Sequence, residues 1–134
     1  MEKLKILLNK YKKAIAKLER VMTIEESDEE FLEIKRDSAI KRFEFCFDLF
    51  WKTLKHFLEY YHGVICNSLK SCIREAFTNK LIEYDEYYLK ICDYRNLTSH
   101  TYDEDIAIIV FQEIPKIIKY FKSFLLKVEK IIEN

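Results

Sequence analysis

The chain of 134 residues has very little glycine and proline, with one residue of each. Tight hairpins, phosphate-binding loops and dinucleotide-binding turns need glycine where the backbone takes a positive φ, so these architectures are nearly excluded. Long apolar runs are also missing, and none approaches the roughly 20 residues that a membrane-spanning helix needs. Residues 1–13 are rich in lysine but amphipathic, without the continuous apolar stretch or the small-residue cleavage site of a signal peptide. We therefore expect a cytoplasmic protein.

An excess of charge of either sign is absent as well. The chain has 23 Lys and Arg residues against 23 Asp and Glu residues, so its formal net charge is zero. A protein that coats a polyanion without a defined site is usually basic. Any contact with nucleic acid must therefore come from a local site or from a cleft formed by oligomerisation.

The four cysteines, which include no C-x-x-C pair, are separated by 20, 6 and 20 positions: Cys46, Cys66, Cys72 and Cys92. Structural zinc sites usually contain such a pair, so we expect no metal site, and we expect no cofactor. Thiols stay reduced in the cytoplasm. The sequence therefore predicts four free cysteines.

Helical periodicity is what the sequence does contain, with 49% apolar and 34% charged residues. Apolar residues at helical spacing predict helices over residues 2–22, 30–61, 69–79, 82–97 and 103–132. No segment alternates apolar and polar residues as a strand does. We predict an all-α fold, an antiparallel helical bundle of about five helices, with residues 1–134 as a single domain.

Three punctuating residues refine these boundaries. Gly63, the only glycine, is expected to end the second helix as a C-terminal cap. Asn67 or Ser68 is expected to cap the third helix. Pro115 is expected to kink or break the last helix, because proline lacks the backbone N–H and its ring clashes with the preceding turn.

The second helix is apolar over more of its girth than a small bundle can cover. Phe45 and Leu49 lie outside its main apolar stripe, and aromatic residues make up 15% of the chain. Such a helix needs cover on two sides. We therefore predict a homodimer with Phe45, Leu49 or their neighbours near the interface.

A polar stretch over residues 93–103 is the most informative part of the sequence. Arg95 offers a planar cation suited to phosphate, and His100 exchanges protons near neutral pH. On an unbroken helix these two side chains would lie about 140° apart, so they converge only if the helix ends between them. Thr98 and Ser99 favour such an end, because their hydroxyls compete for backbone groups. The spacing also fits an interpretation in which Arg95 and His100 only cap the helix terminus.

The run Arg95-Asn96-Leu97-Thr98-Ser99-His100-Thr101-Tyr102 resembles the R-N-x-x-x-H-x-Y signature of HEPN-domain proteins. More narrowly, it resembles the bacterial and archaeal family of nucleotidyltransferase substrate-binding proteins, whose members are the toxin half of HEPN–MNT toxin–antitoxin pairs. A second block, residues 36–45 followed by residues 51–55, is similar to the long second helix of that family. The order of the two blocks and the chain length fit the family over essentially the whole sequence.

The resemblance implies a homodimer in which the two motifs face a shared cleft, and in active members that cleft is a metal-independent endoribonuclease site. Arg95 would hold the scissile phosphate of an RNA substrate, and His100 would act as general acid or base. Asn96 would support the motif. Tyr102 would receive AMP from a cognate MNT-type nucleotidyltransferase, the antitoxin, which silences the toxin.

Two other interpretations remain open. The chain could be a non-catalytic substrate-binding subunit of a two-component nucleotidyltransferase, or a plain helical dimerisation module.

Asp103, Glu104 and Asp105 are explained by capping of the last helix. The tyrosines at positions 84, 87, 88 and 94 are more typical of core or interface rings than of base-stacking platforms.

Overall fold

A computed structural model describes residues 1–133, so Asn134, the end of the expected 1–134 domain, lies outside the described residues. The described residues form five α-helices and one 3-10 turn, and they contain no strand: α1 (Glu2–Met22), α2 (Glu29–His62), α3 (Leu69–Thr78), α4 (Tyr87–Leu97), η1 (Thr98–His100) and α5 (Glu104–Glu133). The prediction of an all-α bundle of about five helices is confirmed.

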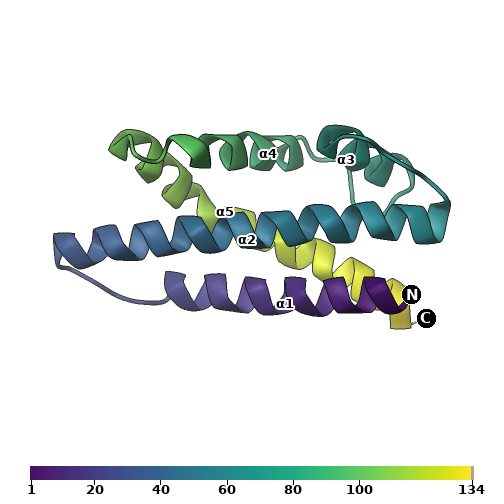
Figure 1. Cartoon of the computed structure of the whole chain (residues 1–134), viewed down its shortest axis with the longest axis horizontal. Coiled ribbons are helices and arrows are strands. Elements are labelled where there is room, and N and C mark those ends of the chain that lie inside the picture. Colours follow the sequence, from purple (N-terminus) through teal and green to yellow (C-terminus); the bar gives the residue numbers. More distant parts are fainter. Residues whose placement is uncertain (134) are drawn as a thin grey trace.

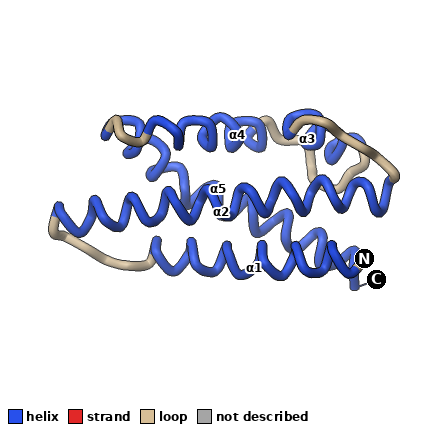
Figure 2. The backbone as a smooth tube through the Cα atoms, viewed as in Figure 1, coloured by secondary structure: helices blue, strands red, loops and turns tan. Residues whose placement is uncertain are grey.

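Helix α2 is the central element of the bundle (Figure 1). Helix α1 packs antiparallel along one side of α2, and α3 and α4 return along its other side. Helix α5 contacts α1, α2 and α4 and ends beside the start of α1, so the two ends of the described chain lie close together. Figure 2 shows that the loop after α1 and the loop after α2 lie at opposite ends of the bundle. This arrangement places the end of α4 beside the N-terminal half of α2.

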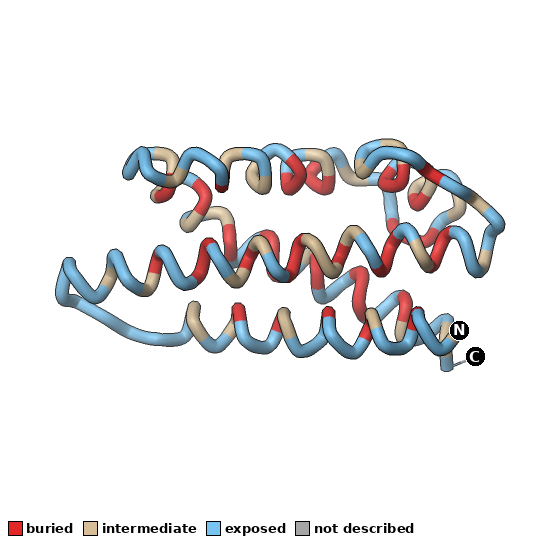
Figure 3. Tube along the Cα trace, in the orientation of Figure 1, coloured by how far each residue is buried: buried red, intermediate tan, exposed pale blue. Residues whose placement is uncertain are grey.

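The core combines aliphatic side chains with a cluster of aromatic rings on the facing sides of α1, α2 and α5. Buried residues face inward along these helices (Figure 3). Tyr11, which is fully buried, donates a hydrogen bond of 2.8 Å to the backbone carbonyl of Phe121. The ring of Phe50 lies 5.0 Å from that of Phe124 and 5.4 Å from that of Phe121, centroid to centroid. These rings account for much of the aromatic content, because edge and tilted contacts stabilise a packed core.

The predicted boundaries hold closely for α1, α2 and α3, and Ser68 caps α3 by accepting from the backbone N–H of Ser71. Gly63 ends α2 with φ +63, the left-handed conformation that glycine adopts without strain. The predicted start of α4 at residue 82 is wrong, since the helix begins at Tyr87. Leu81 and Ile82 are buried within the loop before α4, so their apolar character marks core contact rather than helix.

Pro115 does not break the last helix. Helix α5 is continuous from Glu104 to Glu133, with Pro115 inside it. Pro115 is exposed to solvent. Pro115 cannot donate a backbone hydrogen bond to the carbonyl of Phe111. This missing bond is on the outer side of the helix, where a long helix tolerates lengthened hydrogen bonds best. The expected break is corrected on this ground.

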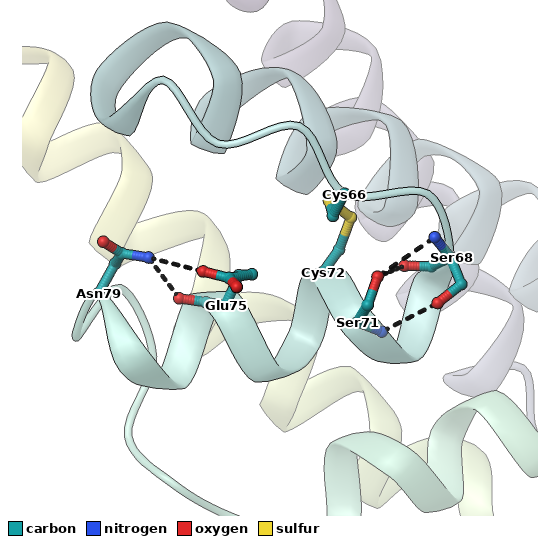
Figure 4. The surroundings of a disulfide bond; sticks show 6 residues. All are labelled: Cys66, Ser68, Ser71, Cys72, Glu75 and Asn79. Carbon is teal, nitrogen blue, oxygen red and sulfur yellow. Dashed lines mark hydrogen bonds between the residues drawn. A yellow bond between two sulfur atoms is a disulfide. The ribbon is translucent and has the colours of Figure 1, made fainter.

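Two of the four cysteines are joined, which corrects the prediction that all four are free. A disulfide links Cys66 to Cys72, with a Cα–Cα distance of 5.3 Å, and it ties the loop after α2 to the first turn of α3 (Figure 4). Spacing alone could not reveal this contact, because it depends on the chain folding back after Gly63. Cys46 and Cys92 are free and buried, and burial raises the pKa of Cys46 to about 12 and that of Cys92 to about 11.

We expect the double substitution Cys66→Ser with Cys72→Ser to lower the free energy of unfolding by about 2 kcal/mol, the value for closing a short loop in the unfolded chain. Denaturant unfolding of the oxidised wild type and the double variant measures the difference. The reduced wild type is the control and should unfold with the double variant. Equal stability of all three proteins would show that the disulfide adds no constraint.

Candidate functional site

Helix α4 ends between Arg95 and His100, which is the condition for the two side chains to converge. The helix stops at Leu97 and continues as one 3-10 turn, Thr98–His100. The hydroxyl of Thr98 donates 2.6 Å to the carbonyl of Arg95, and that of Ser99 donates 2.9 Å to the carbonyl of Asn96. Carbonyls at a helix end have no partner within the helix, and these hydroxyls satisfy two of them. Local chemistry therefore turns the chain at this point.

The chain is then returned into α5 by a second set of contacts. Asp103 accepts from the backbone N–H of Asp105 at 3.0 Å, which caps α5 and supports the capping interpretation of residues 103–105. Arg36, buried in α2, lies 3.5 Å from the carboxylate of Glu104. This pair holds the start of α5 against α2, and the segment with His100 and Tyr102 is fixed at both ends.

Arg95 is held against α2 by two carboxylates. Its Nη1 lies 3.4 Å from Glu44 Oε2, and its Nη2 lies 3.5 Å from Asp48 Oδ1. Nη1 also donates 2.8 Å to the hydroxyl of Thr98. The side chain of Arg95 is 27% exposed, so a solvent-accessible anion can reach the guanidinium while its orientation is fixed.

The sequence pattern missed Glu44 and Asp48. The available signal was their spacing, since carboxylates four residues apart lie on one face of a helix. A matching cation on a different helix cannot be found from that spacing alone. The two carboxylates balance the charge of Arg95 in the single chain, so a phosphate at this site must compete with them for the guanidinium.

His100 and Tyr102 lie together on the surface. The Nδ1 atom of His100 is 3.4 Å from the hydroxyl of Tyr102, and the two ring centroids are 6.0 Å apart. His100 is exposed, and Tyr102 is 86% exposed. Asn96 is exposed one residue after Arg95. In residues 1–133 no hydrogen bond joins Arg95 to His100, so the structure pairs His100 with Tyr102 and Arg95 with α2.

A hollow of about 280 Å³ lies between α2 and the turn that carries Tyr102. Thr101 and Tyr102 line one side of it, and α2 lines the other with Ile40, Lys41, Asp37 and Glu44. Glu44 is thus shared between this hollow and the ion pair with Arg95. The exposed phenol of Tyr102 therefore lies at a hollow that also contains the carboxylate paired with Arg95.

Most of the candidate tyrosines are structural. Tyr87 and Tyr88 are buried, as predicted for core rings. Tyr87 and Tyr94 both donate to the same oxygen of Glu113, at 3.0 and 3.1 Å, and burial together with these bonds raises the pKa of both phenols. Tyr84 differs, since it is 71% exposed. The rings between α4 and α5 therefore fix α4 rather than offer faces to a base.

The fold and the turn together define a class: an antiparallel helical bundle that presents an Arg–His–Tyr set where its fourth helix ends. The sequence profile of the family described as "Nucleotidyltransferase substrate binding protein like" matches residues 7–130. The chain belongs to this family. The family resemblance drawn from the motif at residues 95–102 and from the second block is thereby confirmed. The family is associated with a nucleotidyltransferase partner.

One named relative aligns with part of this chain. A Haemophilus influenzae protein named "Probable ribonuclease HepT" is 34% identical over 80 residues. That alignment covers 57% of this chain and 55% of the relative, so the chain matches only about half the length of that protein.

Two solved structures share the fold over almost the whole chain. The protein ttk003001694 from Thermus thermophilus has a TM-score of 0.75 and 31% identity, covering 92% of this chain and 99% of that one. HI0074 from Haemophilus influenzae has a TM-score of 0.82 and 26% identity, covering 91% and 98%. The HI0074 structure is described as the fold of a substrate binding domain of a nucleotidyltransferase.

No helix within residues 1–133 combines the length and the apolar character needed to span a bilayer.

Proposed function

We propose that this chain is the toxin of a toxin–antitoxin pair, a metal-independent endoribonuclease that acts in the cytoplasm and is neutralised by a cognate nucleotidyltransferase. The observation that carries the proposal is the turn after α4, where an oriented arginine, an exposed histidine and an exposed tyrosine lie within eight residues. The name of the similar ribonuclease supports the same activity. The proposal treats residues 1–134 as one HEPN-like domain.

In the proposed reaction the 2′-hydroxyl of RNA attacks the adjacent phosphorus, and the bond to the 5′ oxygen breaks. A base must take the 2′-hydroxyl proton, and an acid must give one to the leaving 5′ oxygen. The products are a 2′,3′-cyclic phosphate and a 5′-hydroxyl end. One His100 per protomer supplies one of these groups, so two protomers supply both. Arg95 stabilises the charge that develops on the phosphate oxygens. Asn96 supports the turn that separates Arg95 from His100.

The carboxylates beside Arg95 give the site a defined resting state. Glu44 is 22% exposed and Asp48 is 50% exposed at the side chain, so neither pair is deeply buried. Ion pairs of this exposure are weak. A phosphate that accepts two hydrogen bonds from the guanidinium can therefore displace one of the two carboxylates. We propose that Glu44 and Asp48 orient Arg95 until RNA binds.

The proposal requires a homodimer, because one chain offers a single histidine. Phe45 is 44% exposed, and it directly follows Glu44 on the ridge of α2 beside Arg95. A two-fold contact along this ridge would bring two copies of the turn to one cleft. Leu49 is half-buried one helical turn further along and lies at the edge of that contact.

We expect light scattering at micromolar concentration to give about twice the chain mass of 16.3 kDa. Phe45→Glu should shift the mass to that of one chain, because a charge cannot be buried in the contact without a partner. Phe31→Glu is the control, since Phe31 is 56% exposed in the first turn of α2, about four helical turns before Phe45. A wild type with the mass of one chain would remove the composite cleft and the mechanism with it.

A second function is favoured by the similarity to HI0074, whose structure is described as a substrate binding domain of a nucleotidyltransferase. In that case the chain presents a substrate to a separate enzyme and cleaves nothing. Expression of the chain without its partner separates the two functions. The toxin slows growth and leaves cellular RNA cut, whereas a binding subunit leaves growth and RNA unchanged.

A further inference from the structure

The outer face of α1 carries a local excess of cations on this neutral chain. Helix α1 carries seven Lys and Arg residues and only two acids, Glu2 and Glu19. Its buried residues face α2 and α5, so the basic residues occupy the outer face: Lys3, Lys5, Lys10, Lys12, Lys13, Lys17 and Arg20. A local basic surface therefore exists on a protein whose net charge gives no sign of it.

Two hollows run end to end where α1 meets α2. The first, of about 320 Å³, is lined by Lys3, Leu7, Lys52, Lys55, His56 and Glu59. The second, of about 290 Å³, is lined by Lys10, Lys13, Ala14, Lys17, Arg42, Phe45 and Leu49. We call the two together the basic groove. Because α1 rises 1.5 Å per residue, the groove extends about 20 Å from Lys3 to Lys17.

The cations of the basic groove are not neutralised by the protein. None of its seven Lys and Arg residues forms an ion pair within residues 1–133, and Glu59 is its one acidic residue. Elsewhere cations do find partners: Lys12 lies 3.2 Å from Glu129, and Lys122 lies 2.7 Å from Glu19. Unpaired like charges along one groove repel each other, and an extended polyanion relieves that repulsion.

The groove adjoins the candidate site across the ridge of α2. Phe45 lines the groove, and the preceding residue, Glu44, contacts Arg95. Figure 1 shows α1 and α4 on opposite sides of α2, so a strand that leaves the groove and passes α2 beyond the two-fold contact reaches both. The proposed two-fold contact covers only the rim of the groove, at Phe45 and Leu49. It leaves the lysines of α1 open, because a contact that covered them would set lysines against lysines.

We propose that the basic groove binds the phosphate backbone of the RNA strand whose scissile phosphate lies at Arg95. This inference rests on the proposed ribonuclease function and adds the path of the substrate. Lysines act as flexible point charges, which suits backbone contacts that are independent of sequence. The groove therefore contributes affinity, and the turn after α4 carries out the chemistry.

The test is fluorescence anisotropy with a labelled 2′-O-methyl RNA of 20 nucleotides, which binds without being cut. The groove variant combines Lys10→Gln, Lys13→Gln and Lys17→Gln. Its matched control combines Lys119→Gln, Lys127→Gln and Lys130→Gln, three exposed lysines of α5. We expect the groove variant to weaken binding about tenfold and to lower the salt slope by about 2, since each single-strand phosphate contact contributes about 0.7. The control should change the affinity less than twofold.

Equal weakening by the two triple variants would overturn the inference. A poly-glutamate peptide of the same charge that binds as tightly as the RNA would also overturn it, because the occupant would then be an acidic protein segment. A groove variant that becomes monomeric in light scattering would make the groove a contact between copies instead. If the groove variant binds RNA normally while the wild type cuts unmodified RNA, the groove inference fails and the proposed function stands. If the wild type binds no RNA, both fail.

Discussion

Replacing His100 by alanine is expected to abolish RNA cleavage and to leave the bundle folded. His100 is exposed in a turn, so its side chain contributes little to the core. Arg95→Ala should slow cleavage about 30- to 1,000-fold, which corresponds to the 2–4 kcal/mol lost with one oxyanion-stabilising donor. Cleavage of a labelled RNA oligonucleotide by purified variants measures both effects, and circular dichroism checks the fold.

Matched controls separate chemistry from general damage. His62→Ala removes an exposed histidine at the end of α2, and Arg74→Ala removes an exposed arginine of α3. Both should cleave RNA at the wild-type rate. Equal cleavage by the wild type and His100→Ala would reveal a contaminating nuclease and reject the assignment. Loss of helicity in Arg95→Ala would assign Arg95 to the packing of α4 on α2.

Tyr102→Phe is expected to escape silencing by the partner nucleotidyltransferase completely while it keeps its ribonuclease activity. The phenol is 86% exposed, so another enzyme can reach it. AMP attached there forms a phosphodiester, whose negative charge lies beside His100 and the hollow next to Glu44. The added charge and bulk would compete with a substrate phosphate for Arg95 and fill its approach.

Mass spectrometry of the chain co-expressed with the neighbouring nucleotidyltransferase should find one added AMP on the peptide that contains Tyr102. Tyr60→Phe is the matched control, because Tyr60 is 50% exposed on α2, and it should be silenced like the wild type. A modified peptide that maps elsewhere would move the switch to another residue. Silencing of Tyr102→Phe to the same degree as the wild type would also show that the switch lies at another residue.

The fold followed from the sequence wherever the signal was local. Apolar spacing predicted α1 to the residue, and the hydroxyls of Thr98 and Ser99 correctly placed the end of α4 before His100. The start of α4 was predicted five residues too early, because Leu81 and Ile82 pack into the core from the loop before the helix and are not part of the helix. The disulfide was missed because it depends on how the loop after α2 folds back.

The candidate site was predicted in part. Residues 95 to 102 are local in sequence, so the motif and the turn could be found together. The carboxylates that hold Arg95 come from α2, about 50 positions earlier in the chain, and only the packing of α4 on α2 brings them close. The basic groove likewise depends on how α1 lies along α2, which the periodicity of each helix does not determine.

The most direct measurement is a time course of cleavage by the purified wild-type chain, in EDTA, of one RNA oligonucleotide and its 2′-O-methyl copy. The 2′-hydroxyl is the attacking group in the proposed reaction, and Arg95 and His100 need no metal to promote its attack. We predict that the RNA is cut to products with 2′,3′-cyclic phosphate ends and that the 2′-O-methyl copy stays intact. RNA that stays intact in EDTA, or a 2′-O-methyl strand cut as fast as RNA, would contradict the account.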